Sequence, residues 1–354
     1  MVTAQDPFDI ARLPSILHEK LFKLIGYNDM LTFASLKPTN FDIVRSVGRL
    51  IKPTKIDIRI SPTVRRITVS GGDRKPFVWS SHHTRSTCDA RPEVRDMTDV
   101  EFNGRTMKVC RVAEGFATVS DEFVDEMLFM LDTLWTIYRC PVDEIEYTPR
   151  WNIDHMALIL SPWFRSPRRF GMGNVSVYPE ELDHFFDGMR AERFELGAVP
   201  SRSYRTRAPI AFPEIVIAHS RWLTAENLCQ MVDDSRRVTL RNVTFTSVTI
   251  NAALKRWMAG TSRLEVLKLW REPADFTMAE YDGSEIVRDI EVMEGSVKAR
   301  GSVEYFDEDV KYEEGVDVRR DDGLVATLVI DAANVRNQIV FTVWHDPACL
   351  QAPV

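Results

Sequence analysis

The middle of the chain alternates short strand-like runs with amphipathic helical segments, and this alternation restricts the fold more than any other feature. Strands are expected at 144–147, 174–178, 193–196, 214–218, 237–241 and 264–269. Helices are expected between them at 181–190, 224–232 and 248–258. Successive strands begin about 19 to 30 residues apart, close to the roughly 20–29 residues of a leucine-rich repeat unit. One strand and one helix cannot bury their own apolar faces, so such units stack into a curved parallel sheet.

The segment before this array predicts further strands and one long helix. Strict alternation predicts strands at 55–60 and 66–69, a third is expected at 107–112, and the polar stretch 71–96 is interpreted as an exposed loop. Ser120 is expected to cap a helix whose apolar residues share one face. These residues are Phe123, Val124, Met127, Leu128, Leu131, Leu134, Trp135 and Tyr138.

The segment after the array returns to alternation. It predicts strands at 315–319, 324–330 and 339–344. Asp322-Gly323 indicates a hairpin turn, because glycine tolerates the positive φ that such turns require. The acidic stretch 304–314 is interpreted as a solvated loop.

The first fifty residues are predicted to be helical. Leu13-Pro14 opens one helix, since proline fits the first helical turn, and Gly26 ends it. A second short helix ends before Pro38. The predicted fold class is therefore α/β (α+β overall). It consists of an N-terminal helical segment followed by an irregular leucine-rich-repeat-like β/α array, without the repeated Leu and Asn signature, that ends in a β-hairpin segment.

Composition argues against two kinds of partner. The net charge is −7, from 45 Lys and Arg against 52 Asp and Glu, whereas phosphate contacts favour a basic excess. We therefore expect no nucleic-acid partner. No apolar run approaches the roughly 18 residues of a membrane span, and residues 1–10 do not resemble a secretory signal. The five scattered cysteines indicate reduced thiols, so a cytoplasmic or nuclear location is expected, with no membrane partner.

The sequence lacks the common motifs of catalytic and metal-binding chemistry. The sequence has no HExxH and no Gly-x-Ser-x-Gly element, and its histidines have no ligand-like spacing. Asp233-Asp234 and Asp321-Asp322 are better explained as loop or turn pairs than as acid and base. We therefore predict a non-catalytic protein with no catalytic residues, no metal site and no cofactor.

Arginines gather in two loop regions of the array. They are Arg165, Arg168, Arg169, Arg202, Arg205 and Arg207. Guanidinium groups bind carboxylates and phosphates through paired hydrogen bonds, so these residues are candidates to bind an acidic or phosphorylated target. The alternative, which is favoured, is that they are solubilising charges on exposed loops.

Several segments resemble a known family. Leu13-Pro14, the apolar residues of the first helix and the run 29–36 resemble the F-box of the nematode-expanded F-box proteins. Trp222-Leu-Thr with Leu228, the segment 251–265 around Trp257, and 318–328 followed by 341–344 resemble a type 2 F-box-associated domain. The resemblance implies an F-box at 6–50 and a target-binding region at 51–354, with the F-box-associated domain at about 200–345. Trp257 itself is expected to be a core aromatic residue.

The resemblance also implies a function. The chain would be the substrate-receptor subunit of an SCF-type cullin-RING E3 ubiquitin ligase, linking a Skp-type adaptor, and through it a cullin scaffold, to an unknown protein target. The expected adaptor-binding residues are Leu13, Pro14, Ile16, Leu17, Leu21, Leu24, Ile25, Met30, Phe33 and Leu36. The alternative is a stand-alone interaction module with a vestigial F-box, whose helices cap the array. A third possibility, an enzyme of unrecognised type, would need a pocket with several titratable groups.

Overall fold

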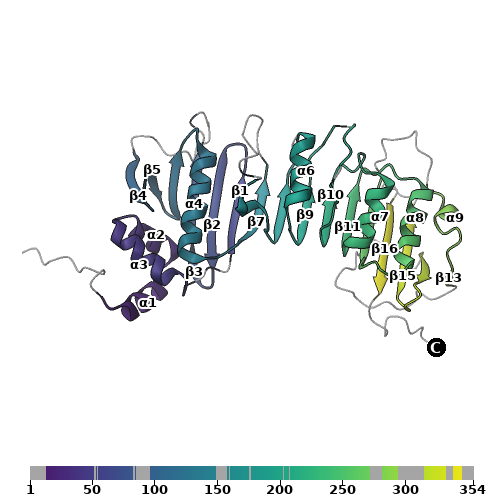
Figure 1. Ribbon diagram of the computed structural model, residues 1–354, viewed down its shortest axis with the longest axis horizontal. Helices are drawn as coiled ribbons and strands as arrows, with labels where there is room; N and C mark the ends of the chain where they lie inside the picture. Colours follow the sequence, from purple (N-terminus) through teal and green to yellow (C-terminus); the bar gives the residue numbers. More distant parts are fainter. Residues whose placement is uncertain are drawn as a thin grey trace, which may run out of the picture. The chain divides into compact units, whose positions relative to one another are not determined.

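The computed structural model describes residues 13–51, 53, 55–82, 84, 96–148, 158, 160–174, 177–201, 203–206, 208–271, 281–293, 315–331 and 338–344. The chain divides into two compact units, Met1–Arg168 and Arg169–Val354. Both units combine helices with strands (Figure 1), which confirms the mixed α/β class. The expected acidic loop at 304–314 lies outside the described residues.

The first unit is built on a mixed sheet. Its strands are β1 (Lys55–Ile60), β2 (Val64–Gly71), β3 (Arg74–His82), β4 (Thr98–Phe102), β5 (Arg105–Val112), β6 (Gly115–Val119) and β7 (Val142–Tyr147). They lie in the order β7-β1-β2-β3-β6-β5-β4, with β1 parallel to β7 and β3 parallel to β6. Alternation in β1 buries Ile56, Ile58 and Ile60, as the sequence pattern predicted.

The strand β3 contradicts the first part of the exposed loop expected at 71–96, of which residues 83 and 85–95 lie outside the described residues. It lies between β2 and β6, so its Phe77 and Trp79 are buried in the core. Its polar end is also buried: the Ser81 hydroxyl donates to Glu126 of the long helix α4 (Phe123–Tyr138). The prediction failed because a central strand buries both of its faces, and hydrogen bonds let polar side chains occupy one of them.

The helix α4 confirms the expected long helix, with Met127, Leu131 and Leu134 buried. Its cap differs from the prediction. Glu122, rather than Ser120, occupies the N-cap position, and the Ser120 hydroxyl accepts the N–H of Glu122 (2.9 Å).

Three helices precede the first sheet: α1 (Ser15–Leu24), α2 (Tyr27–Ala34) and α3 (Pro38–Gly48). The helix α3 was not predicted. Pro38 occupies its first turn, where a missing N–H costs nothing, so it opens a helix as well as following one. The rings of Tyr27 and Tyr138 meet edge to face with centroids 5.6 Å apart, which attaches α2 to α4. A short 3-10 turn, η3 (Pro162–Phe164), lies near the end of this unit.

The second unit contains the strand–helix alternation. Its strands are β8 (Arg169–Met172), β9 (Arg193–Leu196), β10 (Glu214–Ile217), β11 (Arg237–Arg241), β12 (Val266–Trp270), β13 (Val292–Met293), β14 (Val316–Arg319), β15 (Val325–Asp331) and β16 (Gln338–Trp344). Strands β8 to β12 are neighbours in chain order and run parallel, and β16 pairs antiparallel with β12.

Helices connect the parallel strands. They are α6 (Pro179–Gly188), α7 (Ala225–Asp234) and α8 (Ser247–Met258), followed by the short α9 (Gly283–Ile286). Right-handed crossovers between sequential parallel strands place their helices on one face of a sheet, and Figure 1 shows α6, α7 and α8 on the same face. Trp257 of α8 is buried against Phe341 of β16, with ring centroids 4.9 Å apart, as expected for a core aromatic residue.

One strand of this array lies upstream of its predicted place. The strand β8 occupies Arg169–Met172, and the described residues of 174–178 are not in a strand. The two glycines of Gly171-Met-Gly173 would by themselves favour a turn. Pairing with β9 extends this segment instead, and Phe170 stacks on Phe194 with ring centroids 5.6 Å apart. Packing between neighbouring strands therefore overrides the turn preference of glycine.

Candidate functional site

An apolar stripe lies on the solvent-facing side of α1. Ile16, Leu17 and Leu24 are 62%, 42% and 85% exposed, and Leu13 and Leu21 are half-buried. At about 100° per residue, the four of these that belong to α1 fall within one side of the helix roughly 140° wide, which the exposed Lys20 shares, and Leu13 precedes the helix. A surface helix normally turns such a side toward the core. This helix instead presents its apolar side to solvent, where another surface can cover it.

The opposite side of α1 attaches it to the first unit. His18 and Phe22 are buried there, and the Phe22 ring lies 5.6 Å from that of Phe33. Arg74 of β3 donates a hydrogen bond to the carbonyl of Lys23 (3.2 Å). The helix is therefore held by its other side while the stripe stays exposed.

The ends of the next two helices add apolar exposure. Leu36 follows α2 and is 57% exposed, and Leu50 follows α3 and is 58% exposed. Five of the ten exposed large hydrophobic side chains in the described part of the chain therefore lie between residues 16 and 50. We call this set the docking surface: Ile16, Leu17, Leu24, Leu36 and Leu50. Scattered apolar residues are ordinary on a surface, so it is their number within this short segment that singles it out.

The other residues expected to bind an adaptor differ in exposure. Pro14 is exposed, and Ile25 and Phe33 are half-buried. Met30 is fully buried and belongs to the core. In this structure the surface available to a partner is therefore centred on α1 and on the residues that follow α2 and α3.

The candidate arginines are divided between the two units. Arg168 donates two hydrogen bonds to Asp143 (2.9 and 3.1 Å), and Arg169 pairs with Glu195 (2.9 Å). Arg165 is exposed in the first unit, and Arg205 of the second unit donates to the carbonyl of Tyr204 (2.6 Å). Arg202 and Arg207 lie outside the described residues. Intramolecular pairing of Arg168 and Arg169 agrees with the alternative that these are ordinary surface charges.

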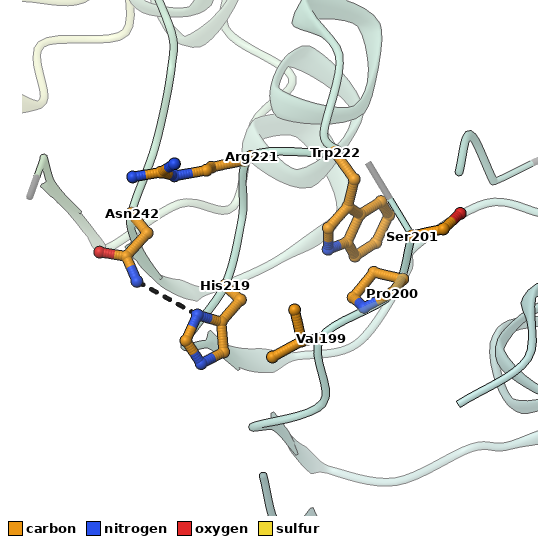
Figure 2. A pocket seen from close by; sticks show the side chains of 7 residues that line it. All are labelled: Val199, Pro200, Ser201, His219, Arg221, Trp222 and Asn242. Atoms are coloured by element: carbon orange, nitrogen blue, oxygen red, sulfur yellow. Dashed lines mark hydrogen bonds between the residues drawn. The ribbon is translucent and has the colours of Figure 1, made fainter. Parts of the chain in front are cut away.

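A second candidate site lies at the carboxyl ends of β9, β10 and β11. A cavity of about 240 Å³ opens there, lined by Val199, Pro200, Ser201, His219, Arg221, Trp222 and Asn242 (Figure 2). The segment 199–201 follows β9, 219–222 follows β10, and Asn242 directly follows β11. Loops at the carboxyl ends of parallel strands are the common location of ligand sites in α/β folds.

Hydrogen bonds fix two polar side chains of this cavity. The Asn242 amide Nδ2 donates to the carbonyl of Ala218 (3.1 Å), which can only accept, so the amide orientation is determined. The same nitrogen contacts His219 Nδ1 (3.2 Å), which must therefore accept the second amide hydrogen. In the neutral ring the proton then resides on Nε2. Asn242 adopts a left-handed backbone (φ 59°), which asparagine tolerates better than most residues.

Aromatic rings hold Trp222 in place at the cavity wall. Its indole packs near the rings of Phe186 and Tyr204, whose centroids are 6.0 and 5.0 Å away. The Tyr204 hydroxyl donates to Asp183 (2.7 Å), and burial raises the pKa of this phenol, which keeps it a donor. Trp222 is only 3% exposed, yet its Nε1–H finds no acceptor among the residues that the structure describes. The indole nitrogens of Trp79 and Trp257 are likewise buried without an acceptor among the described residues, so this feature is not particular to the cavity.

The sequence had singled out Trp222 for its place in a motif, but not as part of a site. No motif in the sequence marked His219, Arg221 or Asn242 as part of a site. What they share is that each follows one of two successive parallel strands. Parallel pairing of these strands brings residues about 20 positions apart to one edge of the sheet.

In the described ranges no three His, Cys, Asp or Glu side chains are placed to hold a metal ion. No described helix combines the length and apolarity needed to cross a bilayer. His83 and His155 lie outside the described residues.

Comparison with family models, curated proteins and solved structures finds no match for this chain. No relative therefore supplies a function, so the functional assignment depends on the docking surface and the cavity described above.

Proposed function

We propose that this chain is the substrate-receptor subunit of an SCF-type cullin-RING E3 ubiquitin ligase. The segment 6–50 is the F-box, and it binds a Skp-type adaptor, which connects the chain to a cullin scaffold. The remainder, 51–354, binds a protein target, with an F-box-associated type 2 domain at about 200–345. One observation carries the proposal: the apolar stripe of α1 faces solvent instead of the core.

The docking surface suits a protein partner on energetic grounds. Fully burying one leucine side chain contributes roughly 1.5–3 kcal/mol, and Leu24 at 85% exposure has most of that gain still available. A few such anchors dominate most protein interfaces. The buried side of α1 is already packed, so a partner can cover the stripe without unfolding the helix.

The sequence resemblance supplies the identity of that partner. Short helices opened by Leu13-Pro14 and carrying outward apolar residues are the features that the resemblance associates with adaptor binding. The parallel β8–β12 array, interpreted as an irregular leucine-rich-repeat-like scaffold, then presents loops to the target. Ubiquitin transfer belongs to other subunits, and this chain contributes proximity by holding the target near the transfer site. The protein is accordingly proposed to be non-catalytic and to work without a cofactor.

The alternative proposal is a stand-alone interaction module with a vestigial F-box. Packing of α2 and α3 against α4 and β3 favours it, because these helices also cover part of the first unit. Under this alternative the fold is unchanged and adaptor binding is absent.

Binding of the full-length chain to a purified Skp-type adaptor separates the two proposals. The test variant carries Leu17→Asp with Leu24→Asp, two exposed positions on α1. The matched control is Val248→Asp, which places the same charge at an exposed apolar position of α8 in the second unit. We expect the wild type and the control to bind, and the double variant to bind at least about tenfold more weakly.

Circular dichroism and thermal unfolding verify that all three proteins are folded. Equal adaptor binding by the folded double variant would contradict the docking surface. Absence of binding by the folded wild type would favour the stand-alone module.

A further inference from the structure

The sheet of the first unit ends at β4, which has a hydrogen-bonded strand on one side only. Within the described part of the chain, β4 pairs with β5 and closes the strand order (Figure 1). The free side of an edge strand presents backbone N–H and C=O groups with which another strand can pair. The residues that present these groups follow from the turn that joins β4 to β5.

The turn determines which residues face the free edge. Asn103-Gly104 joins the two strands with φ values of 46° and 79°, the positive values that a type I′ hairpin turn requires. Phe102, directly before this turn, hydrogen-bonds to β5, and every second residue before it does the same. The backbone groups of the intervening residues, Asp99 and Glu101, therefore face away from β5, and no described residue hydrogen-bonds to them there.

Packing holds β4 as a rigid edge. Val100 and Phe102 are buried, and the Phe102 ring meets that of Phe116 in β6 edge to face with centroids 5.4 Å apart. On β5, the guanidinium of Arg105 lies over the ring of Phe129 in α4, 5.2 Å from its centroid. The edge is therefore already formed, and pre-organised groups lose less entropy when a partner binds.

The side chains of the outward-facing residues give this edge an acidic character. Side chains alternate along a strand, so Asp99 and Glu101 share the exposed side of β4. On β5, Lys108 lies opposite Asp99, whereas the uncharged Thr106 lies opposite Glu101. The exposed side of β4 therefore carries two carboxylates that a new neighbouring strand would meet.

A second copy of this chain is a poor occupant of the edge. Antiparallel pairing of two β4 strands around Val100 would place Asp99 of each copy opposite Glu101 of the other. Directly opposite side chains have their Cβ atoms about 4.5–5.5 Å apart, where like charges repel and unlike charges attract. Charged side chains protect natural edge strands against association with their own kind in this way. A segment with basic residues at the same two positions reverses the sign of both interactions.

The geometry points to a docking site for an extended basic segment of a partner protein, which adds to the sheet as an antiparallel strand beside β4. The segment carries lysine or arginine at two positions separated by one residue, opposite Asp99 and Glu101. The residue between them lies opposite Val100 and points to the buried side of the sheet, where an apolar side chain fits. In such strand addition the main-chain hydrogen bonds supply affinity and the alternate side chains supply specificity.

This site goes beyond the proposed function and does not depend on it. It shares no residue with the docking surface of α1 and the residues after α2 and α3. The Leu17→Asp, Leu24→Asp variant should therefore bind a basic segment as the wild type does.

Fluorescence anisotropy of labelled peptides tests the docking on the full-length chain. The probe is Gly-Thr-Lys-Val-Lys-Thr-amide with a neutral fluorophore at its N-terminus, and the control probe has glutamine in place of both lysines. We expect saturable binding of the lysine peptide and binding about tenfold weaker for the glutamine peptide. Equal binding of the two peptides, or no binding of the lysine peptide, would overturn the docking site and leave the two carboxylates as protection of the edge.

Matched variants locate the binding on the edge strand. Asp99→Asn with Glu101→Gln should weaken the lysine peptide about tenfold. Asp73→Asn with Glu114→Gln, which removes the same charges from two exposed turns of the same unit, should leave its affinity unchanged. An equal loss in both double variants would contradict the assignment to β4.

Charge reversal provides a gain of binding that a misfolded variant would not show. Asp99→Lys with Glu101→Lys should lose the lysine peptide and bind a peptide with glutamate in place of both lysines. Absence of this exchange in a variant that circular dichroism shows to be folded would count against the proposed cross-strand pairs.

Modified peptide backbones separate strand addition from simple charge attraction. In the proposed register the N–H groups of both lysines donate to the carbonyls of Asp99 and Glu101, and the valine N–H points away from β4. N-methylation of the two lysines should therefore abolish binding, whereas N-methylation of the valine should weaken it far less. The lysine peptide should also slow amide exchange at Asp99 and Glu101. Equal effects of the two methylation patterns, or unchanged exchange at both residues, would overturn the strand addition.

Discussion

Arg320 and Asp322 form a two-point ion pair at the turn between β14 and β15. Arginine Nε and Nη2 donate to the two carboxylate oxygens at 3.0 and 2.6 Å, and Nη1 donates to the carbonyl of Ser262 (2.8 Å). The buried guanidinium also lies 5.0 Å from the ring centroid of Trp257. Gly323 completes the turn at φ 90°. The turn motif therefore connects the C-terminal hairpin to the helix α8 and to the loop before β12.

This ion pair predicts a pH dependence. Hydrogen bonding to Arg320 lowers the pKa of Asp322 below its ordinary value of 3.8. A group whose folded pKa is depressed stabilises the protein above the unfolded pKa, and this contribution is lost as the pH falls through the folded pKa. We expect Asp322→Asn to lower the free energy of unfolding at pH 7 by about 1 kcal/mol, after allowance for the half-exposed carboxylate.

Urea unfolding at several pH values checks this. The difference in the free energy of unfolding between the wild type and Asp322→Asn should be constant above about pH 5. It should shrink once the pH falls below the pKa of Asp322 in the unfolded chain. A difference that stays constant down to pH 2 would show that the carboxylate charge is not responsible.

A glycine sets the contact between α3 and α4. A Cβ at Gly48 would lie 2.6 Å from Cγ2 of Ile137 and 2.7 Å from its carbonyl oxygen. Gly48→Ala should therefore lower the free energy of unfolding by about 1–3 kcal/mol, the usual result of overpacking. Gly188→Ala is the matched control, because Gly188 also ends a helix and its added Cβ would meet nothing within 4 Å. Chemical denaturation measures the free energy of unfolding of both variants. Equal values for Gly48→Ala and Gly188→Ala would refute the close contact.

Asn251 clamps the short helix α9. Its Nδ2 donates to the carbonyls of Ile286 (2.8 Å) and Arg288 (2.9 Å) from a buried position on α8. Asn251→Ala removes both hydrogen bonds and should cost about 1–3 kcal/mol. Hydrogen exchange should accelerate first at 283–290. The control is Lys255→Ala on the same helix, whose exposed pair with Asp289 contributes little, and comparable exchange in the two variants would argue against the clamp.

A buried polar chain crosses the C-terminal hairpin. Trp344 Nε1 donates to the hydroxyl of Thr327 (2.7 Å), which donates to Asp317 (2.6 Å). Thr327→Val keeps the shape but removes the hydroxyl, so we expect a loss of roughly 1–3 kcal/mol. Thr327→Ser retains the hydroxyl, so its free energy of unfolding should fall by less than that of Thr327→Val. Thermal unfolding compares the two, and a valine variant as stable as the serine variant would contradict this role of the hydroxyl.

The sequence predicted elements best where burial follows a simple period. β1 and β9 to β11 lie at or within a residue of their expected places, because alternating or continuous apolar runs describe them well. The strand β3 was missed because its buried end is Ser80-Ser81-His82, which is polar in composition. The helix α3 was missed because Pro38 was interpreted only as a stop signal. In both cases the deciding factor was the surrounding packing, which a local pattern does not contain.

The two candidate surfaces were accessible to prediction to different degrees. Apolar periodicity indicated the residues of α1, but not which side of the helix packs inward; His18 and Phe22 decide that. The cavity was beyond local patterns. Its walls come from three loops that meet only after the parallel strands β9, β10 and β11 are paired.

The origin of those walls has a consequence for engineering. Every lining residue follows a strand and none lies within one, while the parallel pairing of β9, β10 and β11 runs through backbone groups. Replacement of the loop segments 199–201 and 219–222 would therefore change the side chains that line the cavity, and the backbone hydrogen bonds between β9, β10 and β11 would remain. Because the lining loops and the paired strands are separate, the parallel strands can serve as a scaffold onto which loops with new binding specificities are grafted.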